Sequence, residues 1–205
     1  AAEVTGNIGV VSQYIFRGVA EDSRTALQGG LDWSGDSGFY AGTWWSTLDY
    51  TETDDSGDGG ATNNNEVDVY AGYAGSVGDF GYDVGVTYFY YTGDGEGTID
   101  VGEETVDSED GDSNTMEPYL SGSYGPFGLS AHYAMNDSIW ANAGDIYLNA
   151  SYATDLPNDF GLGVSVGYHS YEEEGDFNIR SESGGLTDTT ISLTHPLGDA
   201  EMSVN

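Results

Sequence analysis

Eight polar residues stand within segments that otherwise alternate between apolar and small residues, and their types suit the handling of ions. Rings of Asp and Glu along a narrow water path favour cations. A basic side chain facing lipid at the bilayer centre would cost about 2–4 kcal/mol, and an acid somewhat less, so these residues should point inward. We expect the following to line the interior of a barrel: Arg17, Gln28, Asp32, Asp68, Asp83, Glu117, Asp145 and Asn149. The alternative is that they are solvated or hydrogen-bonded within a polar interior.

Arg17 is one of only three basic residues, with Arg24 and Arg180, against thirty-six acidic ones. It stands where the first expected strand meets a polar connection. An inward Arg17 would pair with an acid such as Asp32 or Asp68 and shape a constriction. The alternative is a loop anchor that bonds to backbone carbonyls.

Acidic residues are densest in two polar connections, residues 51–60 and 92–112. Four carboxylates of the second resemble a calcium loop: Asp107, Glu109, Asp110 and Asp112. They lack the regular ligand spacing and the closing bidentate Glu of an EF-hand. A calcium site is one hypothesis here, and a solvated, cation-rich external loop is the other.

Catalysis has little basis in this sequence. It has no Cys and no GxSxG or HExxH motif. Nothing pairs one of its three histidines (His132, His169 and His195) with a nucleophilic serine. His132 and His169 fall instead on the faces expected to point inward. We therefore expect no enzyme activity and no cofactor beyond calcium in the external loops.

The charge balance excludes one class of partner. A net charge of −33 lacks the cationic footprint of nucleic-acid binding and opposes docking on anionic lipid headgroups. Aromatic residues make up 13% of the chain, which argues against disorder. The acidic excess fits a marine or halophilic source, because a highly charged surface stays soluble in salt.

Period-two alternation dominates the chain, and amphipathic helical patterns are nearly absent. We expect strands at residues 4–16, 25–34, 38–49, 66–75, 80–91, 115–124, 127–134, 145–153, 160–170, 188–195 and 200–205. Their connections alternate between long polar segments and short turns rich in Gly, Pro, Asn and Asp. Aliphatic residues at mid-strand, with Tyr or Phe at the ends, oppose small and polar residues on the other face. This pattern is typical of an antiparallel up-and-down transmembrane β-barrel in a Gram-negative outer membrane, here a single domain over residues 1–205.

The strand count and the two termini carry further expectations. Bacterial single-chain barrels have an even number of strands, so we expect twelve in the complete chain, with the closing strand missing after EMSVN. The alternative is a ten-stranded barrel, in which one of the two expected strands near Thr25 and Asp188 is absent. The opening AAEV resembles a mature N-terminus left by signal-peptide cleavage, which implies export. The first long connection follows the first strand, so we expect the N-terminus to lie in the periplasm.

Several segments of residues 7–91 resemble those of a known protein family. The matching segments are NIGVVSQYIFRG at 7–18, ALQGG at 26–30, GFYAGTW at 38–44, EVDVYAGY at 66–73 and YDVG at 82–85. They resemble the TorF-like porin family, a glycine-rich family of bacterial outer-membrane β-barrels formerly of unknown function. The resemblance implies passive pore formation in the outer membrane. Family members generally end on a strand with a terminal aromatic, and this chain does not.

These observations support two functions of different classes. The first is a narrow, cation-favouring outer-membrane porin for passive diffusion of small solutes or ions. The second is a structural or adhesive barrel, surrounded by outer-membrane lipid, that assembles into homo-oligomers or arrays with acidic external loops. A soluble secreted β-sandwich is a third interpretation, which aqueous partitioning without detergent would reveal.

Overall fold

The computed structural model describes residues 2–22, 24–51, 62–92, 97–101, 104–108, 113–172, 183–198 and 200–205. These residues form one antiparallel sheet of eleven strands and two separate two-stranded hairpins. The chain is all-β, and the described residues include no helix long and apolar enough to cross a membrane.

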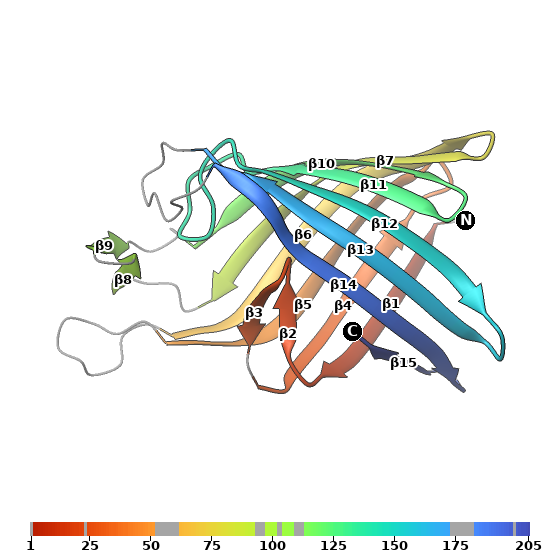
Figure 1. The fold of residues 1–205 in the computed structure, drawn as a ribbon, viewed down its shortest axis with the longest axis horizontal. Coiled ribbons are helices and arrows are strands. Elements are labelled where there is room, and N and C mark those ends of the chain that lie inside the picture. The colour runs from red at the N-terminus through yellow and green to blue at the C-terminus, as the bar shows by residue number, and fades with distance from the viewer. Residues whose placement is uncertain are drawn as a thin grey trace.

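The sheet follows chain order, with neighbouring strands antiparallel (Figure 1). Its strands are β1 (Glu3–Val11), β4 (Ala26–Ser34), β5 (Phe39–Thr51), β6 (Thr62–Val77), β7 (Phe80–Thr92), β10 (Thr115–Tyr124), β11 (Phe127–Tyr133), β12 (Ile146–Leu156), β13 (Phe160–Ser170), β14 (Gly184–Leu197) and β15 (Ala200–Val204). One separate hairpin pairs β2 (Tyr14–Phe16) with β3 (Val19–Asp22), and the other pairs β8 (Gly97–Val101) with β9 (Glu104–Ser108).

The expected antiparallel all-β architecture is confirmed, and each of the eleven expected strands has a counterpart in the sheet. Two predictions at the level of elements were wrong. The expected strand at residues 4–16 is interrupted at Ser12 and Gln13, so its second part becomes β2 of a separate hairpin. The β8–β9 hairpin occupies a connection that was expected to have no strands.

The two edges of the sheet are β1 and β15. The strand pairings of the described residues do not join these edges, so a closed barrel of twelve strands stays a prediction. The ten-stranded alternative was wrong, because both β4 and β14 are present.

The connections sort by length between the two ends of the sheet. The short turns lie at one end, and the connection at residues 134–145 and the β8–β9 hairpin lie at the other (Figure 1). Gly78 and Gly125, in two of the short turns, adopt φ of 61° and 56°, which glycine reaches without steric cost. Connections between sequential neighbouring strands are those of an up-and-down sheet.

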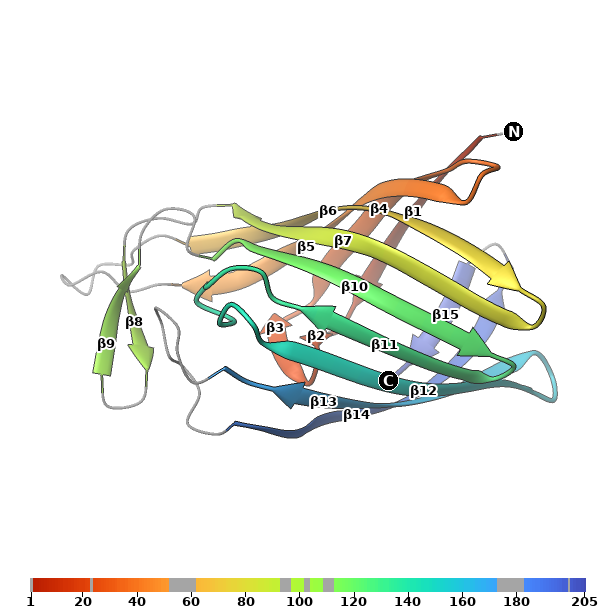
Figure 2. The same cartoon turned by 90° about the horizontal axis from the view of Figure 1, so that it is seen from above.

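The strongly curved sheet has two chemically different faces (Figure 2). On β7, the convex face exposes Val84 and Val86, whereas Asp83 and Phe89 of the concave face are half-buried and buried. The same alternation continues on β10, on β11 and in the first residues of β12, whereas most of β13 is evenly half-buried. Toward the short turns, large apolar side chains therefore point out of the curve and small or polar ones point into it. Toward the other end, large aromatic side chains also point inward.

The buried core lies inside the curve, toward the end with the long connections. It consists of Tyr14, Ala26, Leu48, Phe89 and Tyr91, with Val11, Phe16, Trp44 and Trp140 packed against it. Two of these rings come from the β2–β3 hairpin: Tyr14 lies 5.3 Å from Trp44, and Phe16 lies 5.8 Å from Phe89 between ring centroids. The hairpin is thus held within the sheet by aromatic packing.

Candidate functional site

The β2–β3 hairpin brings Arg17 into the interior. Its turn consists of Arg17 and Gly18, with φ of 46° and 84°, the left-handed pair of a type I′ hairpin turn. A Cβ on Gly18 would lie 2.9 Å from Cβ of Asp188 on β14. The hairpin therefore starts between β1 and β4 and reaches the opposite wall with its tip.

Arg17 makes a two-pronged ion pair with Glu117 of β10. Its Nη1 and Nη2 donate to Oε1 and Oε2 of Glu117 at 2.9 and 2.7 Å. The side chains are only 14% and 9% exposed, so water screens the pair weakly. The guanidinium also lies 4.3 Å from the ring centroid of Tyr147, within range of a cation–π interaction.

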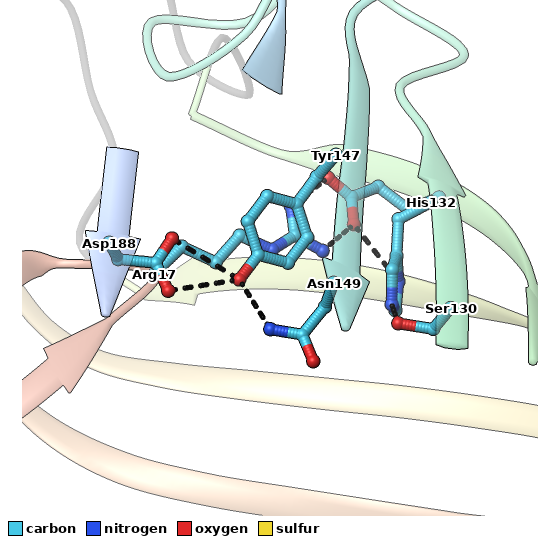
Figure 3. A network of polar contacts seen from close by, with 7 residues as sticks. Arg17, Ser130, His132, Tyr147, Asn149 and Asp188 are labelled. Atoms are coloured by element: carbon cyan, nitrogen blue, oxygen red, sulfur yellow. Dashed lines mark hydrogen bonds and ion pairs between the residues drawn. The ribbon is translucent and has the colours of Figure 1, made fainter. Parts of the chain in front are cut away.

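The surrounding side chains extend this contact into a network across the interior (Figure 3). Tyr147 donates to both carboxylate oxygens of Asp188 at 3.2 Å, and Asn149 donates to the Tyr147 hydroxyl at 3.2 Å. On the other side, His132 Nδ1 lies 3.9 Å from Glu117 Oε2. Arg17 therefore joins a network contributed by β10, β11, β12 and β14.

A second network links tyrosine hydroxyls to acids on the concave face. Tyr40 donates to Asp83 at 2.6 Å and also contacts the Tyr119 hydroxyl. Tyr70 donates to Asp32 at 2.5 Å. These hydrogen bonds hold both acids in place on the concave wall.

A third group lies beneath the hairpin. Glu66 and Asp68 stand at alternate inward positions of β6, with 1% and 9% exposure. The Tyr14 hydroxyl bonds to Glu66. Burial, followed by the charges of Glu66 and Asp68, raises the pKa of Tyr14 above its ordinary value, so this hydroxyl stays protonated. Nearby, Gln28 donates to buried Ser46 at 3.3 Å.

The interior opens toward the short turns. A hollow of about 410 Å³ is lined by Gly75, Gly81, Tyr82, Asp83, Ser121, Gly122, Ser123, Gly128, Leu129, Ser130, Asn149 and Ser151. Glycine and serine dominate this lining, so little side-chain volume fills the space. The interior is roomy at this end, whereas the hairpin and aromatic core fill it at the other.

Two of the residues expected in the interior, Arg17 and Asp145, have partners that the sequence did not predict. Arg17 pairs with Glu117 rather than with Asp32 or Asp68, which corrects the expected partner. The carboxylate of Asp145 accepts from the backbone N–H groups of Asn142 and Glu172 at 2.9 and 2.7 Å. It thereby holds two connections together at the end opposite the short turns.

The expected calcium ligands fall largely outside the described residues. Glu109, Asp110 and Asp112 lie outside them, and Asp107 is described only as part of β9. Within the described ranges, no three His, Cys, Asp or Glu side chains group in a way that could hold a metal ion. Arg180 also lies outside the described residues.

The histidines occupy aromatic surroundings. His132 and His169 flank Tyr147, with ring centroids 6.0 and 4.6 Å away. His195 lies 4.5 Å from Phe160 near the short turns. His132 stands between a serine and an acid, because its Nε2 lies 3.3 Å from Ser130 Oγ and its Nδ1 lies 3.9 Å from Glu117 Oε2 (Figure 3). The expectation that no serine lies beside a histidine was therefore wrong, although Glu117 is also paired with Arg17.

Sequence reasoning missed Glu66, Tyr147 and Asp188. Glu66 could have been found, because it stands two positions from Asp68 and alternate residues of a strand share a face. Tyr147 could have been found in the same way, because it stands at an alternate position between Asp145 and Asn149. Asp188 was recognisable only through the position of the hairpin tip, which the sequence does not specify.

Of the comparisons with known proteins, the one with protein families gives a match. No curated protein and no solved structure matches it. Residues 1–199 match the model of a family described as "Bacterial protein of unknown function (Gcw_chp)". The chain therefore belongs to the Gcw_chp family of bacterial proteins of unknown function.

Proposed function

We propose that this chain is an outer-membrane β-barrel that forms a narrow, cation-favouring channel for small ions or solutes. The observation that supports the proposal most strongly is the polarity of the two faces of the sheet, which is the reverse of that expected for a protein in water. The outward face exposes large apolar side chains strand after strand, including Ile8 at 80%, Leu120 at 60% and Ile191 at 62%. The inward face holds the acids, the hydroxyls and Arg17.

A membrane explains this reversal better than water does. Exposed apolar patches on soluble monomers rarely exceed a few hundred Å², whereas this surface extends over most strands of the sheet. The strands also have suitable lengths, because a membrane-spanning β-strand needs about 9–11 residues. β1 and β4 have nine residues each, β10 has ten, and β12 and β13 have eleven.

The interior supports preference for cations. The hollow near the short turns includes Asp83, and Asp32 lies on the same concave wall. Arg17, the cation of the described interior network, is neutralised by Glu117. The remaining negative charge would attract cations and repel anions along a narrow path. The resemblance of residues 7–91 to TorF-like porins supports the same function and an outer-membrane location.

A second candidate is a closed structural or adhesive barrel. The filled end of the interior favours it, because the hairpin and the aromatic core occupy that space. In this case the apolar outer face would still contact lipid, but ions would not pass.

Conductance in planar bilayers tests the proposal and separates the two candidates. The detergent-purified protein should give discrete steps in KCl. In a KCl gradient, the reversal potential should have the sign of a cation-selective pore. A folded, inserted protein without conductance would refute the channel and leave the structural barrel. Recovery in the aqueous phase without detergent would refute both.

A further inference from the structure

We propose that Ser130 is a nucleophile activated by His132, and that these two residues hydrolyse small, uncharged acyl esters in the adjoining hollow. Both residues stand on β11, two positions apart, and their side chains touch. The activity goes beyond conduction, because it requires only that a substrate enters the hollow.

The serine and the histidine have the contact that a nucleophile and its base require. His132 Nε2 lies 3.3 Å from Ser130 Oγ, and Figure 3 marks this contact. Such contacts are often slightly long without substrate and tighten when it binds. Because alternate residues of a strand share a face, the backbone of β11 holds both side chains on the same wall. His132 can therefore take the Ser130 proton directly.

Glu117 of β10 lies beside the other nitrogen of the His132 ring. Its Oε2 is 3.9 Å from His132 Nδ1, and two hydrogen bonds from Arg17 fix the carboxylate. A carboxylate at this position favours the tautomer with its proton on Nδ1, which leaves Nε2 as the acceptor for Ser130. Because Arg17 offsets the charge of Glu117, Glu117 acts by orienting the ring and is a positioning residue.

A substrate can reach Ser130. The half-buried side chain lines the hollow of about 410 Å³ that opens toward the short turns. This volume falls within the range of about 300–1,000 Å³ that is usual for small-molecule sites. The serine therefore meets open space on one side and its base on the other.

Two polar side chains flank Ser130 on the same face. Ser121 of β10 and Asn149 of β12 stand directly opposite it in register, and both line the hollow. Directly opposite residues have Cβ atoms about 4.5–5.5 Å apart. The Asn149 amide donates one N–H to the Tyr147 hydroxyl at 3.2 Å and carries a second. This second N–H and the Ser121 hydroxyl are the donors that can stabilise negative charge on the ester carbonyl oxygen.

The reaction needs no co-reactant other than water. Ser130 Oγ bonds to the ester carbonyl carbon while His132 Nε2 takes its proton. The bond from that carbon to the alcohol oxygen then breaks, and His132 returns the proton to the leaving alcohol. Water, deprotonated by His132, next cleaves the acyl-serine and releases the carboxylic acid. Asp83 lines the same hollow and would repel an anionic ester, so the substrate is uncharged.

Hydrolysis of p-nitrophenyl acetate and labelling with a fluorophosphonate test the proposal on detergent-purified, full-length protein. The wild type should release p-nitrophenol with saturation kinetics, and mass spectrometry should locate the phosphonyl group on Ser130. Ser130→Ala should abolish both. His132→Gln should lower kcat about 100-fold and slow the labelling. Asn149→Ala should lower kcat about 100-fold with little change in KM.

Matched variants separate this site from other serines and histidines. Ser123→Ala removes a hydroxyl from the same hollow, and His195→Gln removes the histidine beside Phe160; both should react like the wild type. Glu117→Ala removes the group that orients His132, so kcat should fall with KM unchanged. Glu117→Gln keeps an acceptor at this position and should restore most of kcat.

Two results would overturn the proposal. One is folded wild-type protein in which the fluorophosphonate leaves Ser130 unmodified, a result that needs no variant to fold. The other is ester hydrolysis that persists in Ser130→Ala, because a different group would then be the nucleophile. Neither assay measures conductance, so the esterase and the channel can fail independently.

Discussion

Removal of the Arg17 side chain should loosen the hairpin that fills one end of the interior. Arg17→Ala deletes both hydrogen bonds to Glu117, at 2.9 and 2.7 Å, and the contact with the Tyr147 ring. Glu117 would keep a carboxylate that is 9% exposed and has lost its cation. We expect larger single-channel conductance and stronger cation preference, because the hairpin is freed and a positive charge is lost.

The cost in stability follows from the burial of the pair. Breaking a buried ion pair from one side costs about 3–5 kcal/mol, and loss of the cation–π contact adds about 1 kcal/mol. Water entering from the interior would reduce this cost, so we expect a loss of about 3 kcal/mol. The double variant Arg17→Ala with Glu117→Gln should be less destabilised than Arg17→Ala alone, because the second change removes the unpaired negative charge of Glu117.

Denaturant unfolding in lipid or detergent and bilayer recording on the same samples provide the assay. Arg24→Ala is the matched control, because the Arg24 side chain is 63% exposed and lies 3.7 Å from Asp22. Asp22 keeps its hydrogen bond from the backbone N–H of residue 24 in this variant, so we expect a smaller loss of stability than in Arg17→Ala. A folded Arg17→Ala protein with unchanged conductance and ion preference would refute the idea that Arg17 and its hairpin narrow the channel. A double variant less stable than Arg17→Ala would refute the electrostatic reasoning.

Three further predictions concern other parts of the molecule. Gly18→Val should destabilise the hairpin, because φ is 84° and the added Cβ would meet Asp188 at 2.9 Å; slower proteolysis of this segment than in the wild type would contradict it. Leu120→Arg should cost about 2–4 kcal/mol of stability in lipid, whereas Ser121→Arg on the opposite face should cost less, and equal losses would argue against a lipid-facing surface. Tyr40→Phe removes the hydroxyl that donates to Asp83 at 2.6 Å, so single-channel noise or cation preference should change, and identical recordings would exclude a role for this pair in conduction.

The sheet was predictable because its signals are local. Alternation assigns each residue to one of two faces, and Gly, Pro, Asn and Asp mark the short turns. This is why the faces of β7, β12 and β13 agree with expectation. The break after Val11 was missed because Tyr14, Ile15 and Phe16 continue the alternating pattern after a two-residue interruption.

The interior network was only partly predictable. The inward position of Arg17 follows from its place near the end of an alternating segment, whereas its partner depends on a hairpin that crosses the interior. Glu117 is one hundred residues away along the chain, and no local pattern selects it over Asp32 or Asp68. Long-range pairing of this kind is fixed by the position of the hairpin tip against β14.

Cysteine accessibility tests most directly whether the outer face contacts lipid and the inner face contacts water. The chain has no native cysteine, so single substitutions report one position each. Ser121→Cys lies on the concave face and Leu120→Cys on the adjacent outward position, where leucine is 60% exposed. In reconstituted liposomes, a charged, membrane-impermeant thiol reagent should modify Ser121→Cys and reduce conductance, while Leu120→Cys stays unmodified. Modification of Leu120→Cys with protection of Ser121→Cys would contradict the proposed arrangement.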